Sequence, residues 1–205
     1  MPENLSNKWQ KEEKEPLADK IKNKVAPPGP MGEQFNLAKK KLNEEIQQLG
    51  RISDRLDAKD KALYDQLVKA YAEHDTARAT ALANELAELR KVESRTQYGK
   101  YALEKAYNKI EMAKDFGDIV ATLVPVGQIV KKVRGTLADF LPSTSTALGE
   151  INNLMSETIT SFQGMSGNVS MLGPSNEDAD KILQEAVAIA EKRLKDKLRP
   201  VGLDQ

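Results

Sequence analysis

Two neighbouring stretches of the chain carry apolar or small side chains at every seventh position. The first stripe runs through Phe35, Leu42, Leu49, Leu56, Leu63 and Ala70. The second runs through Leu82, Leu89, Thr96, Leu103, Ile110, Gly117 and Val124. Further apolar residues three or four places on widen both stripes. Only a helix aligns this spacing on one face, so the pattern predicts two long amphipathic helices, each requiring a partner.

The polar stretch around His74 and Asp75 separates the two stripes and predicts a chain reversal there. If the helices then run antiparallel, Leu63 faces Leu86 and Leu42 faces Ala106, and the numbers of facing residues add to 148 or 149. The predicted seam of this hairpin comprises Leu42, Leu49, Leu56, Leu63, Leu82, Leu86, Leu89, Leu103 and Ile110. The same register sets Gly50 opposite Gly99, which predicts a close approach of the two backbones or a hinge.

The chain beyond the hairpin predicts shorter helices that fold back on it. Pro125 is expected to interrupt or kink the second helix at about Val124, because proline removes a backbone donor. Apolar faces follow at Val126, Ile129, Val130, Val133, Leu137 and Phe140, and then at Leu148, Ile151, Met155, Ile159 and Phe162. A last amphipathic helix begins at Ser175, with a capping-box-like partner at Asp178.

The expected fold class is therefore all-α, a long antiparallel helical hairpin with shorter C-terminal helices packing on it. We divide the chain into four parts. Residues 1–32 form a flexible arm, and residues 33–162 form the hairpin core and the helices after it. Residues 163–174 form a Gly-rich and Ser-rich linker, and residues 175–205 form a regulatory or partner-binding helix and tail.

Composition narrows the range of functions. The 205 residues include 31 basic and 31 acidic side chains and no cysteine, so there is neither the basic excess of a nucleic-acid binder nor a thiolate site. His74 is the only histidine and lies at the predicted turn, and no catalytic constellation or glycine-rich phosphate loop accompanies it. We expect no enzyme activity, cofactor or metal. The absence of a long apolar run and of a signal sequence predicts a cytoplasmic protein.

The N-terminal arm contains a candidate membrane contact. Leu5 and the only tryptophan, Trp9, share a helical face beside Lys8 and Lys11, a pattern that suits a membrane interface with anionic lipid. The alternative is that Trp9 packs on the hairpin. A second candidate is the basic group of Lys131, Lys132 and Arg134, for which a solvated helix face is the competing interpretation.

Three segments together carry a family likeness. The stretch AYAEHDTARATALANELAELRKV, residues 70–92, resembles the hairpin tip of ESCRT-III (Snf7-type) proteins. The segments LVPVGQIVKKVRGTLADFLP and DKILQEAVAIAEKRLKDKL follow in the order and spacing of the archaeal members, the CdvB-type cell-division proteins. The resemblance spans roughly residues 33–199, and its specificity comes from this order, since each motif alone is only a helical pattern.

The resemblance implies subunits that polymerise into filaments with copies of themselves and with paralogous ESCRT-III subunits. Such filaments constrict membranes during scission or cell division, at the division site. It also implies remodelling by a Vps4/CdvC-type AAA ATPase that recognises the C-terminal helix. Here Glu191, Arg193, Leu194 and Leu198 approximate the helical form of that motif, and Leu198, Pro200 and Val201 approximate the extended form.

Two other functions remain open at the level of sequence. A bacterial PspA or Vipp-like membrane-maintenance protein shares the hairpin but usually begins with a stronger lipid-binding helix. A soluble coiled-coil adaptor would bind partner helices through the same apolar faces and never polymerise.

Overall fold

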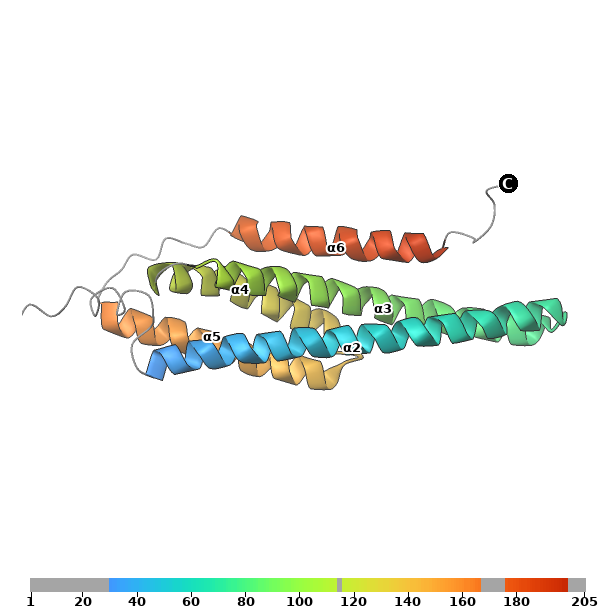
Figure 1. Ribbon diagram of the computed structural model, residues 1–205, viewed down its shortest axis with the longest axis horizontal. Helices are drawn as coiled ribbons and strands as arrows, with labels where there is room; N and C mark the ends of the chain where they lie inside the picture. Colours follow the sequence, from blue (N-terminus) through green and yellow to red (C-terminus); the bar gives the residue numbers. More distant parts are fainter. Residues whose placement is uncertain (1–29, 114–115, 167–175, 199–205) are drawn as a thin grey trace, which may run out of the picture.

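The computed structural model describes residues 30–113, 116–166 and 176–198, and these residues form five helices with no strand among them. The helices are α2 (Pro30–Ala72), α3 (Thr76–Glu111), α4 (Phe116–Leu137), α5 (Pro142–Ser166) and α6 (Asn176–Leu198). The predicted all-α fold with a long hairpin and shorter helices packed on it is confirmed (Figure 1). Residues 1–29 of the predicted arm, most of the predicted linker and the last seven residues lie outside the described residues, and the last three residues of the predicted arm form the start of α2.

The long antiparallel pair is formed by α2 and α3. The 43 residues of α2 span about 65 Å at 1.5 Å per residue. Polar pairs across the hairpin show an antiparallel pairing whose residue numbers add to one or two more than predicted. Lys39 with Glu111, Ser53 with Gln97 and Asp60 with Arg90 each add to 150. The side chains of the seam are more deeply buried near the start of α2 and the end of α3 than towards the turn at His74. Leu42, Leu49, Leu86, Leu103 and Ile110 are buried, whereas Leu56, Leu63, Leu82 and Leu89 are half-buried.

The reversal occurs where the sequence predicts it, at His74 and Asp75. His74 is exposed and adopts the left-handed conformation with a φ of 59°, which closes the turn after the last residue of α2. The Asp75 side chain caps α3 by accepting a hydrogen bond from the backbone N–H of Arg78 at 3.0 Å. This tight connection holds the two long helices in one register.

The second long helix ends earlier than predicted, and the expectation of an interruption at Pro125 is wrong. α3 stops at Glu111, and Pro125 lies buried inside α4. The break before α4 leaves one uninterrupted stripe of buried side chains on that helix: Ile119, Leu123, Val126, Ile129, Val130, Val133 and Leu137. Burial at about 1.5–3 kcal/mol for each side chain outweighs the roughly 3 kcal/mol that an interior proline costs a helix.

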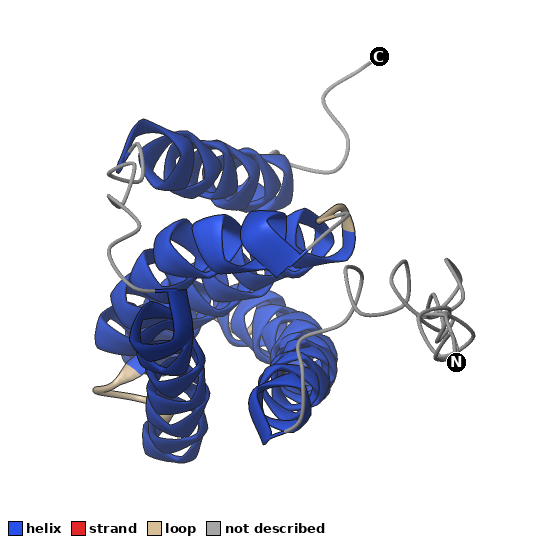
Figure 2. Cartoon of the chain, turned by 90° about the vertical axis from the view of Figure 1, so that its left-hand side faces the viewer, coloured by secondary structure: helices blue, strands red, loops and turns tan. Residues whose placement is uncertain are grey.

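A four-helix arrangement closes around the base of the hairpin. α4 packs on α3, and α5 packs on both α4 and α2. Viewed end-on, the helices surround a common core with α6 on the outside (Figure 2). The predicted linker begins later than expected, since α5 continues to Ser166. The tip of the hairpin projects beyond α4, α5 and α6 (Figure 1).

Gly50 and Gly99 have different surroundings, and the predicted close approach of the two hairpin backbones at these residues is not found. A Cβ atom on Gly50 would meet only the end of the Lys100 side chain, at 3.9 Å. A Cβ atom on Gly99 would lie 3.1 Å from both Val133 and Leu137 of α4. The small residue at position 99 therefore lets α4, and not α2, approach α3 closely.

This difference predicts opposite tolerance at the two glycines. Gly99→Val inserts a branched side chain against Val133 and Leu137 and should lower the free energy of unfolding by about 1–3 kcal/mol. Gly50→Val, the matched control, enters open space and should change it by less than about 0.5 kcal/mol. Urea denaturation of both variants measures the difference, and equal effects would contradict the packing described.

Candidate functional site: the seat of α6 on the hairpin

The last helix lies against the outer side of α3 and reaches α4. Its buried apolar residues are Ala179, Leu183, Ala186 and Ala190, with Ile182 partly buried beside them. Only Leu183 in the fully buried set is larger than alanine, so apolar contact supplies a modest part of the docking free energy. Polar contacts therefore weigh more at this interface than in the four-helix base.

Charged pairs hold α6 along its length. Near its N-terminus, Asp178 accepts a hydrogen bond from Lys109 at 2.6 Å. About two turns further on, Glu185 lies 3.4 Å from Lys105. In both pairs the lysine comes from α3 and the carboxylate from α6. The order of the pairs shows that α6 runs antiparallel to α3, and hence parallel to α2.

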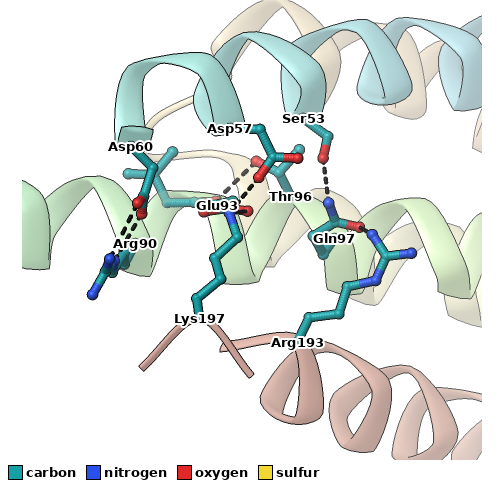
Figure 3. A network of polar contacts seen from close by, with 10 residues as sticks. Ser53, Asp57, Asp60, Arg90, Glu93, Thr96, Gln97, Arg193 and Lys197 are labelled. Carbon is teal, nitrogen blue, oxygen red and sulfur yellow. Dashed lines mark hydrogen bonds and ion pairs between the residues drawn. The ribbon is translucent and has the colours of Figure 1, made fainter. Parts of the chain in front are cut away.

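The C-terminal end of α6 enters a group of side chains that we call the α6 seat. It is formed by Ser53, Asp57, Glu93 and Gln97 (Figure 3), together with the ring of Tyr101. Arg193 donates a hydrogen bond to the Gln97 side-chain oxygen at 3.1 Å and lies over the Tyr101 ring at 5.0 Å. The Gln97 amide in turn donates to the Ser53 hydroxyl. Arg193 is thereby held through one side chain from α3 that is itself fixed by α2.

Lys197 lies between two carboxylates, Asp57 from α2 and Glu93 from α3, and donates a hydrogen bond to each (Figure 3). Glu93 is buried, while Asp57 and Lys197 are half-buried. One ammonium group thus joins three helices and neutralises part of the charge that two neighbouring acids would otherwise place together.

The acids in the seat respond differently to this environment. Burial raises the pKa of Glu93, although hydrogen bonding to Lys197 opposes that shift. For Asp57, burial also acts to raise the pKa, but the hydrogen bonds to Lys197 and Glu93 and the nearby positive charges outweigh it, so its pKa is lowered. The pKa of Lys197 is raised, because its carboxylate partners outweigh the effect of burial. The effect of Lys197 on the pKa of both acids requires α6 to be docked.

A neighbouring pair locks the hairpin itself. Arg90 donates two hydrogen bonds to Asp60, at 2.7 and 3.1 Å, and the Asp60 side chain is only 8% exposed. The hydrogen bonds to Asp60 raise the pKa of Arg90. This bidentate contact fixes the register of α2 against α3 directly beside the seat.

Of the predicted ATPase-binding residues, the structure places Arg193 in contact with this seat. Arg193 is engaged with Gln97 and Tyr101, Leu194 is half-buried, and Glu191 is exposed. Leu198 is the last residue of α6, and Pro200 and Val201 lie outside the described residues. The sequence analysis did not identify Lys197, Asp57 or Glu93. The available signal was weak, because acids and lysines at these spacings also occur on ordinary solvated helix faces.

The predicted membrane-contact residues fall into two groups. Leu5, Lys8, Trp9 and Lys11 lie outside the described residues. Lys131 and Lys132 are exposed on α4, and Lys132 borders a groove between α4 and α6. Arg134 faces α5 instead, where its guanidinium lies 3.2 Å from the position of a Cβ atom on Gly149. Of these three exposed basic residues, Arg134 is the one whose side chain lies against a neighbouring helix.

Two features are absent from the described residues. No helix there combines the length and the hydropathy needed to cross a bilayer. Nor does that part of the chain gather three or more His, Asp or Glu side chains in a position to hold a metal ion.

The contribution of Lys197 can be measured directly. Lys197→Met should weaken α6 docking by about 1–3 kcal/mol, because Asp57 and Glu93 lose their shared cation and repel each other. Lys192→Met, which changes an exposed lysine on the same helix, is the matched control. Hydrogen exchange of residues 176–198 should accelerate only in the first variant. Unchanged protection in Lys197→Met would contradict the importance of this contact.

Comparison with known proteins places the chain in a family. It is 31% identical over 163 residues to cell division protein B1 of Sulfolobus acidocaldarius, a match that covers 78% of this chain and 75% of that protein. It is 25% identical over 158 residues to cell division protein B of the same organism, covering 77% of this chain and 60% of that protein.

No protein-family model and no solved structure matches the chain. The level of identity to the B1 protein and the share of both chains that it covers are nevertheless sufficient for an assignment. The resemblance drawn from the hairpin tip and the last helix is confirmed by these relatives. The chain belongs to the archaeal cell division protein B (CdvB) family.

Proposed function

We propose that this protein is a subunit of a polymer that assembles on membranes and constricts them during archaeal cell division. The relatives named cell division protein B1 and B support the cell-division role. The observation that carries the polymer role is the slender α2–α3 hairpin with a separable, charge-held helix on its side. Nothing among the described residues favours an enzyme.

The shape of the subunit suits side-by-side stacking. α2 and α3 form a rod whose distal part has no third helix against it (Figure 1). Large apolar side chains are exposed on this part, namely Tyr64, Val68 and Tyr71. A neighbouring copy can cover such a surface along its length, whereas a compact globule would offer only a small patch.

In the structure described above α6 is docked on the hairpin, and we call this conformation the closed form. Docked α6 would keep the subunit from assembling. α6 covers the seat on the hairpin, and its contacts are largely charged pairs that water and salt can replace. The contact of α5 with α2 is also partly polar. It contains the buried Glu45, whose pKa is raised by burial, next to Thr144. Opening these contacts exposes faces that other copies can cover, so assembly replaces intramolecular packing.

The proposed remodelling by a AAA ATPase fits the same switch. Arg193 takes part in holding α6 on its seat, so an ATPase that reads Glu191, Arg193, Leu194 and the residues after Leu198 would require α6 to be released. Under this proposal the ATPase acts on assembled subunits whose α6 is released, and not on free subunits whose α6 is docked.

Deleting residues 175–205 should promote assembly. The truncated chain loses the helix that covers the seat, so it should sediment as a polymer at concentrations where the full chain remains small. Electron microscopy with anionic liposomes should show rings, tubes or coated vesicles. The full chain carrying Lys192→Ala is the control and should behave as the wild type. A truncated chain that forms only uniform small oligomers would favour the adaptor and contradict the polymer proposal.

Membrane attachment is proposed to use the arm around Trp9. Leu5→Ser with Trp9→Ser should reduce the fraction of protein that floats with anionic vesicles about tenfold, since two apolar anchors are lost. Lys131→Glu with Lys132→Glu tests the second candidate surface by the same flotation assay. If neither pair of changes alters flotation, attachment through these residues is excluded and a partner subunit must supply it.

A further inference from the structure

The chain contains the same short pattern twice, on two different helices. α6 carries Arg193-Leu194-Lys195-Asp196-Lys197, and α2 carries Arg55-Leu56-Asp57-Ala58-Lys59. In both, an arginine and a leucine precede a lysine that lies four residues after the arginine. On α6 this arginine and lysine are the two cations that enter the seat.

On α2 the corresponding cations have no ion-pair partner among the described residues. Arg55 and Lys59 are both exposed. Within the described part of the chain neither forms an ion pair, although Asp57 lies between them in sequence. Residues four apart on a helix lie on the same side of it, so the two side chains point outwards together. We call Arg55 and Lys59 the basic ridge.

The basic ridge and the seat lie on different sides of α2, at the same position along the helix axis. Asp57 faces the seat, and a separation of two residues rotates a side chain by about 200° around a helix. Arg55 and Lys59 therefore point away from the side on which α6 docks. One surface of the subunit presents paired cations, and the other presents the paired acids that bind such cations.

The direction of α6 makes this complementarity geometrically specific. Arg193 docks at the level of Ser53, and Lys197 docks at the level of Asp57, so the cations run in the same direction as α2. A second copy placed alongside, with its α2 parallel to the first, needs an axial shift of only two residues, about 3 Å, to bring its Arg55 and Lys59 to these levels.

The seat contains a hydrogen-bond acceptor that α6 leaves without a donor and that such a partner could use. The Oε2 atom of Glu93 is buried and accepts no hydrogen bond within the described structure, although its other oxygen accepts from Lys197. A buried carboxylate oxygen without a donor is costly. α6 is therefore an incomplete match for the seat, which favours its replacement by a partner that brings further donors.

From this juxtaposition we propose that the basic ridge of one copy occupies the α6 seat of the next copy in the assembled state. The inference rests on the proposed polymer function and adds the contact that would build it. Because ridge and seat are different surfaces on opposite sides of one hairpin, the contact is heterologous and repeats without closing, as a filament requires. α6 then keeps the free subunit closed by mimicking the neighbour's ridge.

Charge exchange between copies tests this contact. Every variant is a full chain that also carries Arg193→Ala and Lys197→Ala, which empties the seat and is called the opened chain. The ridge variant adds Arg55→Glu and Lys59→Glu, and the seat variant adds Asp57→Lys and Glu93→Lys. Sedimentation without lipid measures assembly, and electron microscopy identifies the product.

The opened chain should pellet as filaments. In each charge-reversed variant like charges meet, so the protein concentration needed for half-maximal pelleting should rise about tenfold or more, equivalent to a loss of about 1.4 kcal/mol at each contact. An equal mixture of the two should recover assembly, because each reversed surface then finds its complement on the other variant. The control, Lys40→Glu with Lys69→Glu, makes the same charge change elsewhere on α2 and should assemble like the opened chain.

Arg55→Ala with Lys59→Ala tests the ridge without adding charge and alters only exposed side chains. Full assembly of this variant, or a mixture that is not rescued while both components show a native helical melting curve, overturns the inference alone. A ridge variant that assembles normally but no longer binds anionic vesicles would assign the ridge to lipid and also overturn it. Failure of the opened chain to assemble, with or without vesicles, instead overturns the proposed function and this inference with it.

Discussion

The antiparallel seam between α2 and α3 is the contact on which the rest of the structure depends. α4 packs on α3, α5 spans from α4 to α2, and α6 docks on α3 beside side chains from α2. Each of these placements requires the two long helices to be in register. The capped reversal at Asp75 and the bidentate Asp60–Arg90 pair set that register, while the buried leucines supply most of the free energy.

The helices on this seam are attached by two different kinds of force. α4 is held by large aliphatic side chains that are excluded from water, and their burial even retains a proline inside the helix. α6 is held by Leu183 and three buried alanines, and by polar contacts that include Lys197 between Asp57 and Glu93. Aliphatic burial changes little with ionic strength, whereas contacts between half-exposed charges weaken as salt rises. The subunit therefore combines a permanent part with a part that responds to its surroundings.

Much of the architecture could be predicted from the sequence because it follows from helical periodicity. The seven-residue spacing and the polar turn at His74 predict the hairpin and its register without reference to any contact. Periodicity could not locate the end of α3, because the stripe continues from Ile110 to Val124 across the break. Pro125 predicted a helix break at the wrong position. The free-energy cost of a proline inside a helix is outweighed here by the burial of apolar side chains of α4, which occurs only in the folded protein.

The α6 seat could not be predicted for a related reason. Asp57, Glu93 and Lys197 are ordinary charged residues in sequence, and each resembles many others on the solvated faces of these helices. They come into contact only because α6 packs antiparallel to α3, with Lys197 level with Asp57 and Glu93. The repeated Arg-Leu-x-x-Lys pattern was visible in the sequence, but its meaning depends on knowing that one copy is docked and the other is exposed.

The uneven thickness of the molecule has a consequence for any array built from it. At its base the hairpin is flanked by α4, α5 and α6, whereas the projecting tip consists of α2 and α3 alone (Figure 1). Wedge-shaped units laid next to one another in parallel cannot form a flat sheet or a straight ladder, because their broad ends need more room than their narrow ends. Such a row bends towards the narrow ends, and the taper of a single subunit thus sets a preferred radius for the whole array.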